Sequence, residues 1–273
     1  MKGLVAILLG IISLSVGVRG QAYPTNQVWT RTGMVEFHQE RGTIFSIDVD
    51  GREYWITAKH ILTGATHPPY GSVTDKSVTL RFLDPNSEEL NWVPLTFSVI
   101  DPGPDIDIVA LAPSYAILLN PLPSVATDGV GLILGGDCEF LGFPYGGGWR
   151  ATFEGGQRYW VPYVKHCTVS GTPTGNVFIL DGINNPGFSG GPVLFNTGLN
   201  QKIFAVISGY RLEPAEVIAS AQHKAEPIKH PAKRGPSVAV NVNSGFIIAY
   251  AINPAIAAIR KNPIGPLRVP GPK

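Results

Sequence analysis

The stretch Asn185–Pro192 reads NPGFSGGP, with Ser189 set between glycines. A serine hydroxyl is a poor nucleophile unless a base takes its proton and hydrogen-bond donors stabilise the oxyanion that its attack creates. Glycines beside such a serine let the backbone turn sharply, so that two amide groups can point at one spot. We expect these donors, an oxyanion hole, to be the amides of Gly187 and Ser189. Taken alone, the octapeptide is equally compatible with an ordinary Gly-rich turn.

Two residues upstream suit the same chemistry. His60 comes just after the strand-like run Trp55–Ala58, where a short loop can hold it at the rim of a barrel. Asp107 stands in an otherwise apolar run, and a buried carboxylate needs a strong partner such as an imidazole N–H. We interpret Ser189 as the nucleophile, His60 as the general base and Asp107 as the residue that orients the histidine. Asp105 is a rival for this third role.

The chain order of these three residues separates two folds. Gly187–Gly191 also matches the Gly-x-Ser-x-Gly elbow of α/β-hydrolases, which needs a strand-to-helix turn and places Ser before Asp before His. Here the order is His, Asp, Ser, and Pro192–Phe195 after the serine predicts a strand. Both observations exclude the elbow.

The remainder of the chain is rich in short strand-like runs. Gly42–Val49 and Glu53–Ala58 are apolar, β-branched or aromatic, and Asp50-Gly51 between them predicts a hairpin turn. Many short strands at such spacing predict sandwiches or barrels rather than alternating β and α units. Further strands are expected at 77–82, 95–100, 106–112, 132–134, 138–142, 159–169, 177–180, 192–195, 203–210 and 246–252, and a helix at 254–261.

Composition is consistent with a compact β-rich protein. The 273 residues suffice for one large or two medium domains, and the 32 glycines and 24 prolines form no low-complexity tract, which indicates frequent turns. The net charge of +1 argues against nucleic acid as the main partner. Scattered histidines and the absence of a Cys-rich cluster predict no metal and no other cofactor.

Residues 1–20 have the pattern of an export signal. Lys2 precedes the apolar run Leu4–Val18, and Gln21 is the expected first mature residue. The run is about 15 residues, short of the roughly 20 that span a membrane, although an uncleaved anchor is the alternative. We expect a secreted or periplasmic protein that leaves the membrane after cleavage.

Export would permit a disulfide between Cys138 and Cys167, with two buried free thiols as the alternative.

Four motifs in chain order resemble the trypsin-like (chymotrypsin-fold) serine peptidases, and within them the bacterial branch that contains the HtrA-type protease domains. The resemblance covers residues 30–262, nearly all of the expected mature chain. The motifs are Gly42–Phe45 with Thr57–His60, Asp107–Leu111, Gly136-Asp137 with Gly142–Pro144, and Asn185–Pro192.

This resemblance implies an all-β fold of two antiparallel six-stranded β-barrels with a short C-terminal helix and an active site between the barrels. Together with the export signal (1–20) and the Pro-rich end (263–273), it divides the chain into a first barrel (21–125) and a second barrel with the helix (126–262). It also implies a serine endopeptidase that cleaves protein or peptide substrates through an acyl-enzyme. The implied substrate pocket is lined by Ile183, Asn184, Val206, Ser208 and Tyr210. Because this lining holds no charged side chain, small or apolar substrate residues are expected there.

The chain also departs from the family pattern. Phe188 stands where the family usually carries Asp or Asn, so a pseudoprotease that binds without cleaving is the alternative function. No Ile-Val-Gly-Gly-like terminus is present, so activation by an inserted amino terminus is not expected. A PDZ domain, usual in HtrA proteins, is not expected after the second barrel.

Arg211–Val238 is a long insertion, either a solvated loop or a basic lid.

Overall fold

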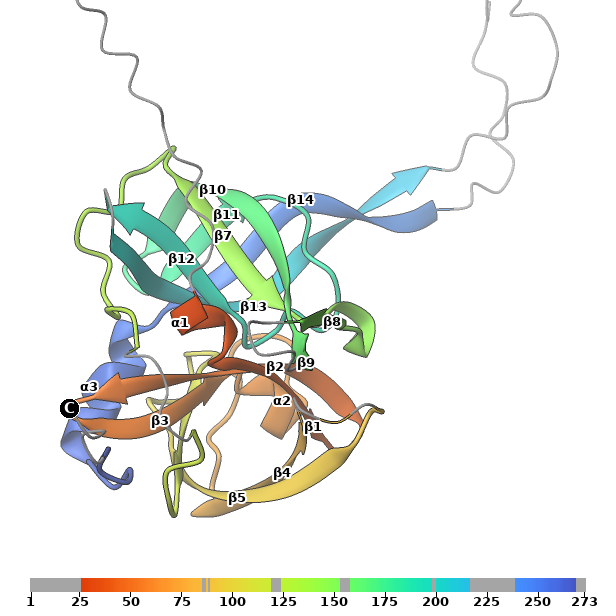
Figure 1. Ribbon diagram of the computed structural model, residues 1–273. Coiled ribbons are helices and arrows are strands. Elements are labelled where there is room, and N and C mark those ends of the chain that lie inside the picture. The colour runs from red at the N-terminus through yellow and green to blue at the C-terminus, as the bar shows by residue number, and fades with distance from the viewer. Residues whose placement is uncertain are drawn as a thin grey trace, which may run out of the picture.

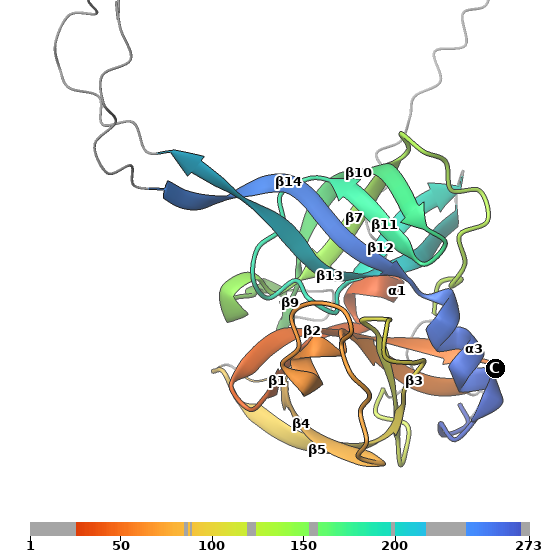
Figure 2. The same cartoon turned by 180° about the vertical axis from the view of Figure 1, so that it is seen from behind.

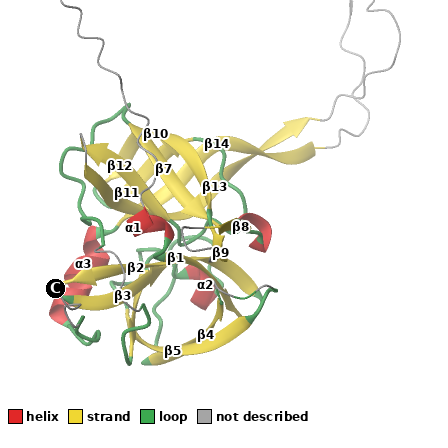
Figure 3. Cartoon of the chain, viewed as in Figure 1, coloured by secondary structure: helices red, strands yellow, loops and turns green. Residues whose placement is uncertain are grey.

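The computed structural model of the chain describes residues 26–84, 87, 89–118, 124–152, 158–197, 200–216 and 239–268. Its strands form two closed antiparallel barrels of six strands each, which lie one above the other in Figure 1, and a separate two-stranded sheet. Strands and loops dominate the chain, with only short helices (Figure 3). The predicted fold class, two six-stranded barrels with a short C-terminal helix, is confirmed.

The first barrel closes in the order β1-β2-β3-β6-β5-β4. The predicted hairpin at Asp50-Gly51 is confirmed: Val49 pairs with Arg52, and both turn residues have positive φ, 50° and 75°. Two-residue hairpin loops with this geometry match the twist of the strands that they join. The six strands are β1 (Thr32–Phe37), β2 (Glu40–Val49), β3 (Arg52–Thr57), β4 (Ser77–Leu83), β5 (Trp92–Ile100) and β6 (Val109–Pro113).

The second barrel closes in the order β10-β11-β14-β13-β12-β7. Cys138 and Cys167 face each other on β7 and β10 with their Cα atoms 4.9 Å apart, and they form a disulfide. The strands are β7 (Asp137–Gly142), β10 (Tyr163–Thr174), β11 (Val177–Asp181), β12 (Pro192–Thr197), β13 (Asn200–Glu216) and β14 (Ala239–Ala251). The separate sheet consists of β8 (Trp149–Thr152) and β9 (Arg158–Val161).

A core shared by the two barrels holds them together. Phe45 and Ile56 from the first barrel and Leu141 and Val206 from the second are buried in one apolar cluster. The helices are α1 (Asn26–Trp29), α2 (His60–Thr63), the 3-10 helix η1 (Pro144–Gly146) and α3 (Asn253–Lys261). Although α3 follows the second barrel in sequence, it packs against β2, β5 and β6 of the first, as the rear view shows (Figure 2).

Several strand boundaries differ from the prediction. The strand expected at 132–134 is absent, and these residues form turns. The strand expected at 159–169 is interrupted at Pro162 into β9 and β10, because proline cannot donate a ladder hydrogen bond. The strand at 32–37 was not expected. Finally, β13 and β14 run well beyond the predicted 203–210 and 246–252 and form a long twisted arm that leaves the second barrel (Figures 1 and 2).

The segment 263–268, expected as part of the Pro-rich tail, contains no helix or strand but is bound to the first barrel, where Leu267 forms an isolated bridge with Arg52. Arg268 contacts Asp48 at 3.0 Å and Glu53 at 3.1 Å, and Asp48 also binds Arg31 at 2.6 Å. The amide of Glu53 donates to the Pro266 carbonyl at 3.0 Å. These contacts join segments from both ends of the described chain.

Several sequence-based expectations fall outside the described residues: the export signal at 1–20 with the expected first mature residue Gln21, residues 217–238 of the insertion Arg211–Val238, and residues 269–273 of the Pro-rich tail. Within the described part of the chain, none of the helices has the length and apolar character needed to cross a membrane.

Candidate active site

His60 and Asp107 are joined by two hydrogen bonds. His60 begins α2 directly after β3, and Asp107 lies in the loop just before β6 rather than within the predicted strand. Asp107 Oδ1 accepts the His60 amide at 2.8 Å, and Oδ2 lies 2.6 Å from Nδ1 of the ring. The Asp107 side chain is fully buried, whereas that of His60 is 21% exposed. Because Nδ1 is engaged by the carboxylate, Nε2 is the ring nitrogen left to accept a proton. The rival Asp105 is exposed.

Ser208 links this pair to Ser189. Its hydroxyl donates to Asp107 Oδ2 at 2.5 Å, and its carbonyl accepts the Ser189 hydroxyl at 3.1 Å. The carboxylate of Asp107 therefore accepts three hydrogen bonds, which fix its position. Among the described residues, no hydrogen bond joins Ser189 to His60; catalytic hydrogen bonds are often long or misaligned without substrate.

A buried pair of tyrosines lies within the electrostatic influence of this carboxylate. The Tyr250 hydroxyl donates to the Tyr70 hydroxyl at 3.2 Å. Burial raises the pKa of Tyr250, and the bond to Tyr70 and the charges of Asp107 and Asp105 raise it further. The phenol therefore stays neutral and adds no competing charge beside Asp107.

The turn around Ser189 requires glycine. Gly187 has a φ of 100°, and a Cβ atom there would meet the Phe143 carbonyl oxygen at 2.2 Å. Gly190 has a φ of 85°, and its Cβ would meet the Thr43 carbonyl oxygen at 2.2 Å. Within the described residues, neither the Gly187 amide nor the Ser189 amide donates a hydrogen bond. These two amides are therefore available to an oxyanion.

Thr43 of β2 holds this turn from the opposite barrel. Its hydroxyl donates to the Gly187 carbonyl at 2.7 Å and accepts the Phe143 amide at 3.1 Å. Its own amide donates to the Ser189 carbonyl at 2.8 Å. The backbone on both sides of the candidate oxyanion hole is thus tied to the first barrel.

Phe188 also anchors the turn. Its side chain is fully buried in the core of the second barrel, and its ring packs edge-to-face on Phe140 with centroids 5.0 Å apart. Where the family usually carries a polar residue, this chain therefore uses apolar burial to hold the residue before Ser189.

The residue before His60 is held by a buried ion pair. Lys59 is fully buried, and its Nζ lies 2.6 Å from Asp101 Oδ1 and also donates to the Gly103 carbonyl. Asp101 in turn accepts the Val73 amide at 2.8 Å. A buried charge needs such partners, and these bring the strand end that carries His60 to the loop that leads to Asp107.

The residues predicted to line the substrate pocket have different surroundings. The Ile183 side chain is 54% exposed, whereas Asn184 is 1% exposed and donates to the Gly209 carbonyl at 3.2 Å. Val206 is fully buried in the shared core, and Ser208 binds Asp107. Tyr210 borders a groove of about 1000 Å³ on the second barrel, which is also lined by Ile179, Leu212, Phe246 and Ile248.

Sequence reasoning missed several residues that support the site. Ser208 was assigned to the pocket, and nothing local indicates its bond to Asp107, which is 101 positions away. Thr43 and Lys59 belonged to the quoted motifs but had no role assigned. Lys165 could have been noticed in the sequence, because it is a charged residue on the strand face that also holds Cys167 and Val169, which is an inward face.

No family model and no curated protein sequence matches this chain. Solved structures do resemble it. An HtrA-type protease, AlgW, in a structure with a tripeptide, is 15% identical, with a TM-score of 0.49 over 87% of this chain and 61% of AlgW. A thermostable serine protease, AL20, from an extremophilic microorganism is 13% identical, with a TM-score of 0.49 over 84% of this chain and 94% of AL20. Rv3671c from M. tuberculosis, in an inactive mutant form, is 16% identical, with a TM-score of 0.45 over 85% of each chain. This chain spans about three fifths of the length of AlgW.

Proposed function

We propose that this chain is a serine endopeptidase in which Ser189 is the nucleophile, His60 the general base and Asp107 the residue that orients it. One observation carries the proposal: the buried carboxylate of Asp107 binds the amide and Nδ1 of His60, and Ser208 connects it to Ser189, whose turn presents two unengaged amides. An oriented base and free oxyanion donors are two of the parts that acyl transfer by a serine uses, and both support the proposal.

In the proposed reaction, the Ser189 hydroxyl leaves the Ser208 carbonyl and attacks the scissile carbonyl carbon, while Nε2 of His60 takes its proton. The amides of Gly187 and Ser189 would stabilise the resulting oxyanion. The protonated His60 then donates to the leaving amine as the C–N bond breaks, which leaves an acyl ester on Ser189. Water hydrolyses this ester with His60 acting again as base and then acid.

The proposed substrates are proteins or peptides with a small or apolar residue at the cleaved bond. Ile183, Asn184, Ser208 and Tyr210 contribute no charged side chain. The side-chain amide of Asn184 is committed on both sides, since it donates to Gly209 and its oxygen accepts the Asn185 amide at 2.8 Å. We also propose that the protein acts after export, which follows from the pattern of residues 1–20.

The test is covalent labelling of purified residues 21–273 with a fluorophosphonate probe, read by intact mass. We expect one adduct on the wild-type protein and none on Ser189→Ala. The matched control is Ser98→Ala, an exposed serine on β5, which should be labelled like the wild type.

His60→Ala should lose labelling as well, because the hydroxyl is then left without its base. A folded wild-type protein that takes up no probe would contradict the proposal. It would instead favour the pseudoprotease alternative, for which the missing Ser189–His60 hydrogen bond among the described residues is the supporting observation.

A further inference from the structure

Lys165 lies at an inward-facing position of the second barrel. On β10 it pairs with Phe140 of β7, and two residues later Cys167 pairs with Cys138. Paired residues of antiparallel strands share a face of the sheet, and alternate residues of one strand return to that face. Phe140, Cys138 and Cys167 are all buried in the barrel core. Lys165 therefore stands where the alternation calls for an apolar side chain.

The ammonium group of Lys165 is bound by a single short segment of the chain. Nζ donates to the Ile183 carbonyl at 2.7 Å and to Asn185 Oδ1, and it lies 5.4 Å from the centre of the Phe188 ring. Lys165 is half-buried, and a partly desolvated cation gains from hydrogen-bond acceptors and from an aromatic face. Burial lowers the pKa of Lys165. All three partners lie within residues 183–188, directly before Ser189.

This segment leads straight into the candidate oxyanion hole. The Asn185 carbonyl accepts the Phe188 amide at 3.3 Å, which closes the turn that contains Gly187. The Asn185 side chain also donates to the Tyr145 hydroxyl at 3.2 Å, and the Tyr145 amide donates to the Pro186 carbonyl at 2.7 Å. A shift of Asn185 would therefore change the direction of the amides at Gly187 and Ser189.

We propose that Lys165 is a positioning residue that holds the oxyanion hole of this enzyme in its formed geometry. The inference rests on the proposed function, because the hole matters only if Ser189 reacts. Lys165 acts through Ile183, Asn185 and Phe188 and does not touch the reacting atoms. Its effect should therefore appear in stabilisation of the transition state rather than in binding of the ground state.

The test compares Lys165→Met with Lys165→Arg and with a matched control, Lys202→Met. Lys202 also lies on a second-barrel strand and also binds one side-chain oxygen and one carbonyl, Asp128 Oδ1 at 2.7 Å and the Val130 carbonyl at 3.1 Å. For each folded variant, kcat and KM are measured on an amide peptide substrate. Affinity is measured for a peptide boronate, which forms a tetrahedral adduct on the serine, and for the corresponding product peptide.

Lys165→Met should lower kcat about 30-fold, with KM and product affinity within about twofold, since lost oxyanion stabilisation acts on the transition state. Boronate affinity should fall by the same factor as kcat. Lys165→Arg should recover most of both, because a guanidinium can donate to the same acceptors. Lys202→Met should match the wild type.

Unchanged kcat and boronate affinity in folded Lys165→Met would overturn the proposal, and so would a change in KM alone, which would mark Lys165 as a support of the substrate pocket. Thermal unfolding shows which variants are folded. If Lys165→Met is not, Lys165→Gln is read in the same way, because its shorter neutral amide cannot span both acceptors. A wild-type protein that the fluorophosphonate does not label would refute the proposed function itself, which separates that failure from failure of the Lys165 inference.

Discussion

At the scale of single residues, Thr43 shows how one side chain joins the two halves of the site. It belongs to the first barrel, yet its hydroxyl and amide bind Gly187 and Ser189 of the second. Its carbonyl accepts the Thr57 hydroxyl at 2.7 Å, on the strand that leads to His60. Hydrogen bonds from Thr43 therefore connect the strand that leads to the proposed base with the proposed oxyanion hole, although the two are far apart in the sequence.

Thr43→Val keeps the shape of this side chain and removes its hydroxyl. The Gly187 carbonyl and the Phe143 amide then lose their buried partner, which should cost about 1–3 kcal/mol in the free energy of unfolding. Because Gly187 is no longer held, we expect kcat/KM to fall about 10- to 100-fold. Urea denaturation and peptide hydrolysis measure the two effects.

Two control variants test whether the effect comes from the Thr43 hydroxyl. Thr43→Ser should stay close to the wild type, and Thr79→Val removes an exposed threonine hydroxyl that bonds Thr96, so it should change neither quantity. Wild-type kcat/KM in Thr43→Val would show that the hydroxyl does not position the hole.

At the scale of elements, β7 and β10 carry much of what surrounds the candidate oxyanion hole. The end of β7 leads to Phe143, whose amide binds Thr43, and β10 carries Lys165. The disulfide joins these two neighbouring strands at directly opposed positions. It therefore adds a covalent link to a pair of strands that hydrogen bonds already hold in register.

The double variant Cys138→Ala with Cys167→Ala should lower the free energy of unfolding by about 3.5 kcal/mol, on the chain-entropy model of a bridge. The two cysteines are 29 positions apart, and the closed loop restricts the unfolded chain. Urea denaturation of both proteins measures the loss, and the reduced wild type should behave like the variant. Two thiols titrating in denatured, unreduced wild-type protein would contradict the bridge.

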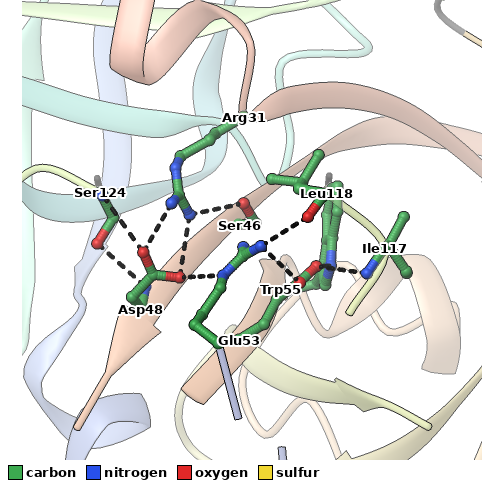
Figure 4. A network of polar contacts seen from close by, with 9 residues as sticks. Arg31, Ser46, Asp48, Glu53, Trp55, Ile117, Leu118 and Ser124 are labelled. Atoms are coloured by element: carbon green, nitrogen blue, oxygen red, sulfur yellow. Dashed lines mark hydrogen bonds and ion pairs between the residues drawn. The ribbon is translucent and has the colours of Figure 1, made fainter. Parts of the chain in front are cut away.

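At the scale of the whole molecule, the charge network around Asp48 joins residues near both ends of the described part of the chain to the first barrel (Figure 4). Burial alone would raise the pKa of Asp48, but hydrogen bonds and charges from Arg31 and Arg268 outweigh it and lower the pKa below its usual 3.8. Burial raises the pKa of Glu53, only partly opposed by Arg268 and Trp55. As the pH falls, the contribution of Asp48 to the free energy of unfolding therefore decreases, whereas that of Glu53 increases.

Asp48→Asn should lower the free energy of unfolding at neutral pH by about 3 kcal/mol, because it removes the carboxylate that the buried Arg31 and the half-buried Arg268 share. A lowered pKa in the folded state contributes stability above pH 3.8, and this stability is lost as the pH falls through the folded value. The difference in the free energy of unfolding between Asp48→Asn and the wild type should therefore be largest above pH 5 and shrink below pH 3.8.

Urea denaturation at a series of pH values makes this measurement. The matched control is Asp50→Asn in the same hairpin, whose pair with Arg260 is exposed and should contribute about 0.5 kcal/mol or less. A deficit of Asp48→Asn that stayed constant down to pH 3 would contradict the assignment to this carboxylate.

Much of the fold could be predicted from particular residues. Asp50-Gly51 identified the hairpin between β2 and β3, and the runs around it identified the two strands. The strand at 132–134 was wrong because three apolar residues do not distinguish a strand from a turn, and Leu132 packs on the second core from a turn. The ends of β13 and β14 were missed because their outer parts carry polar residues, and cross-strand pairing rather than composition extends them.

Features that depend on local backbone chemistry could be read from the residues alone: the turns that need glycine at positions 51 and 187, and the short apolar runs that become barrel strands. The identity of the side chains that support the candidate site depended on the folded arrangement. Thr43 meets Gly187 across 144 positions, and Ser208 meets Asp107 across 101. Such contacts depend on how two closed barrels pack together and on strand register, and no local propensity encodes either.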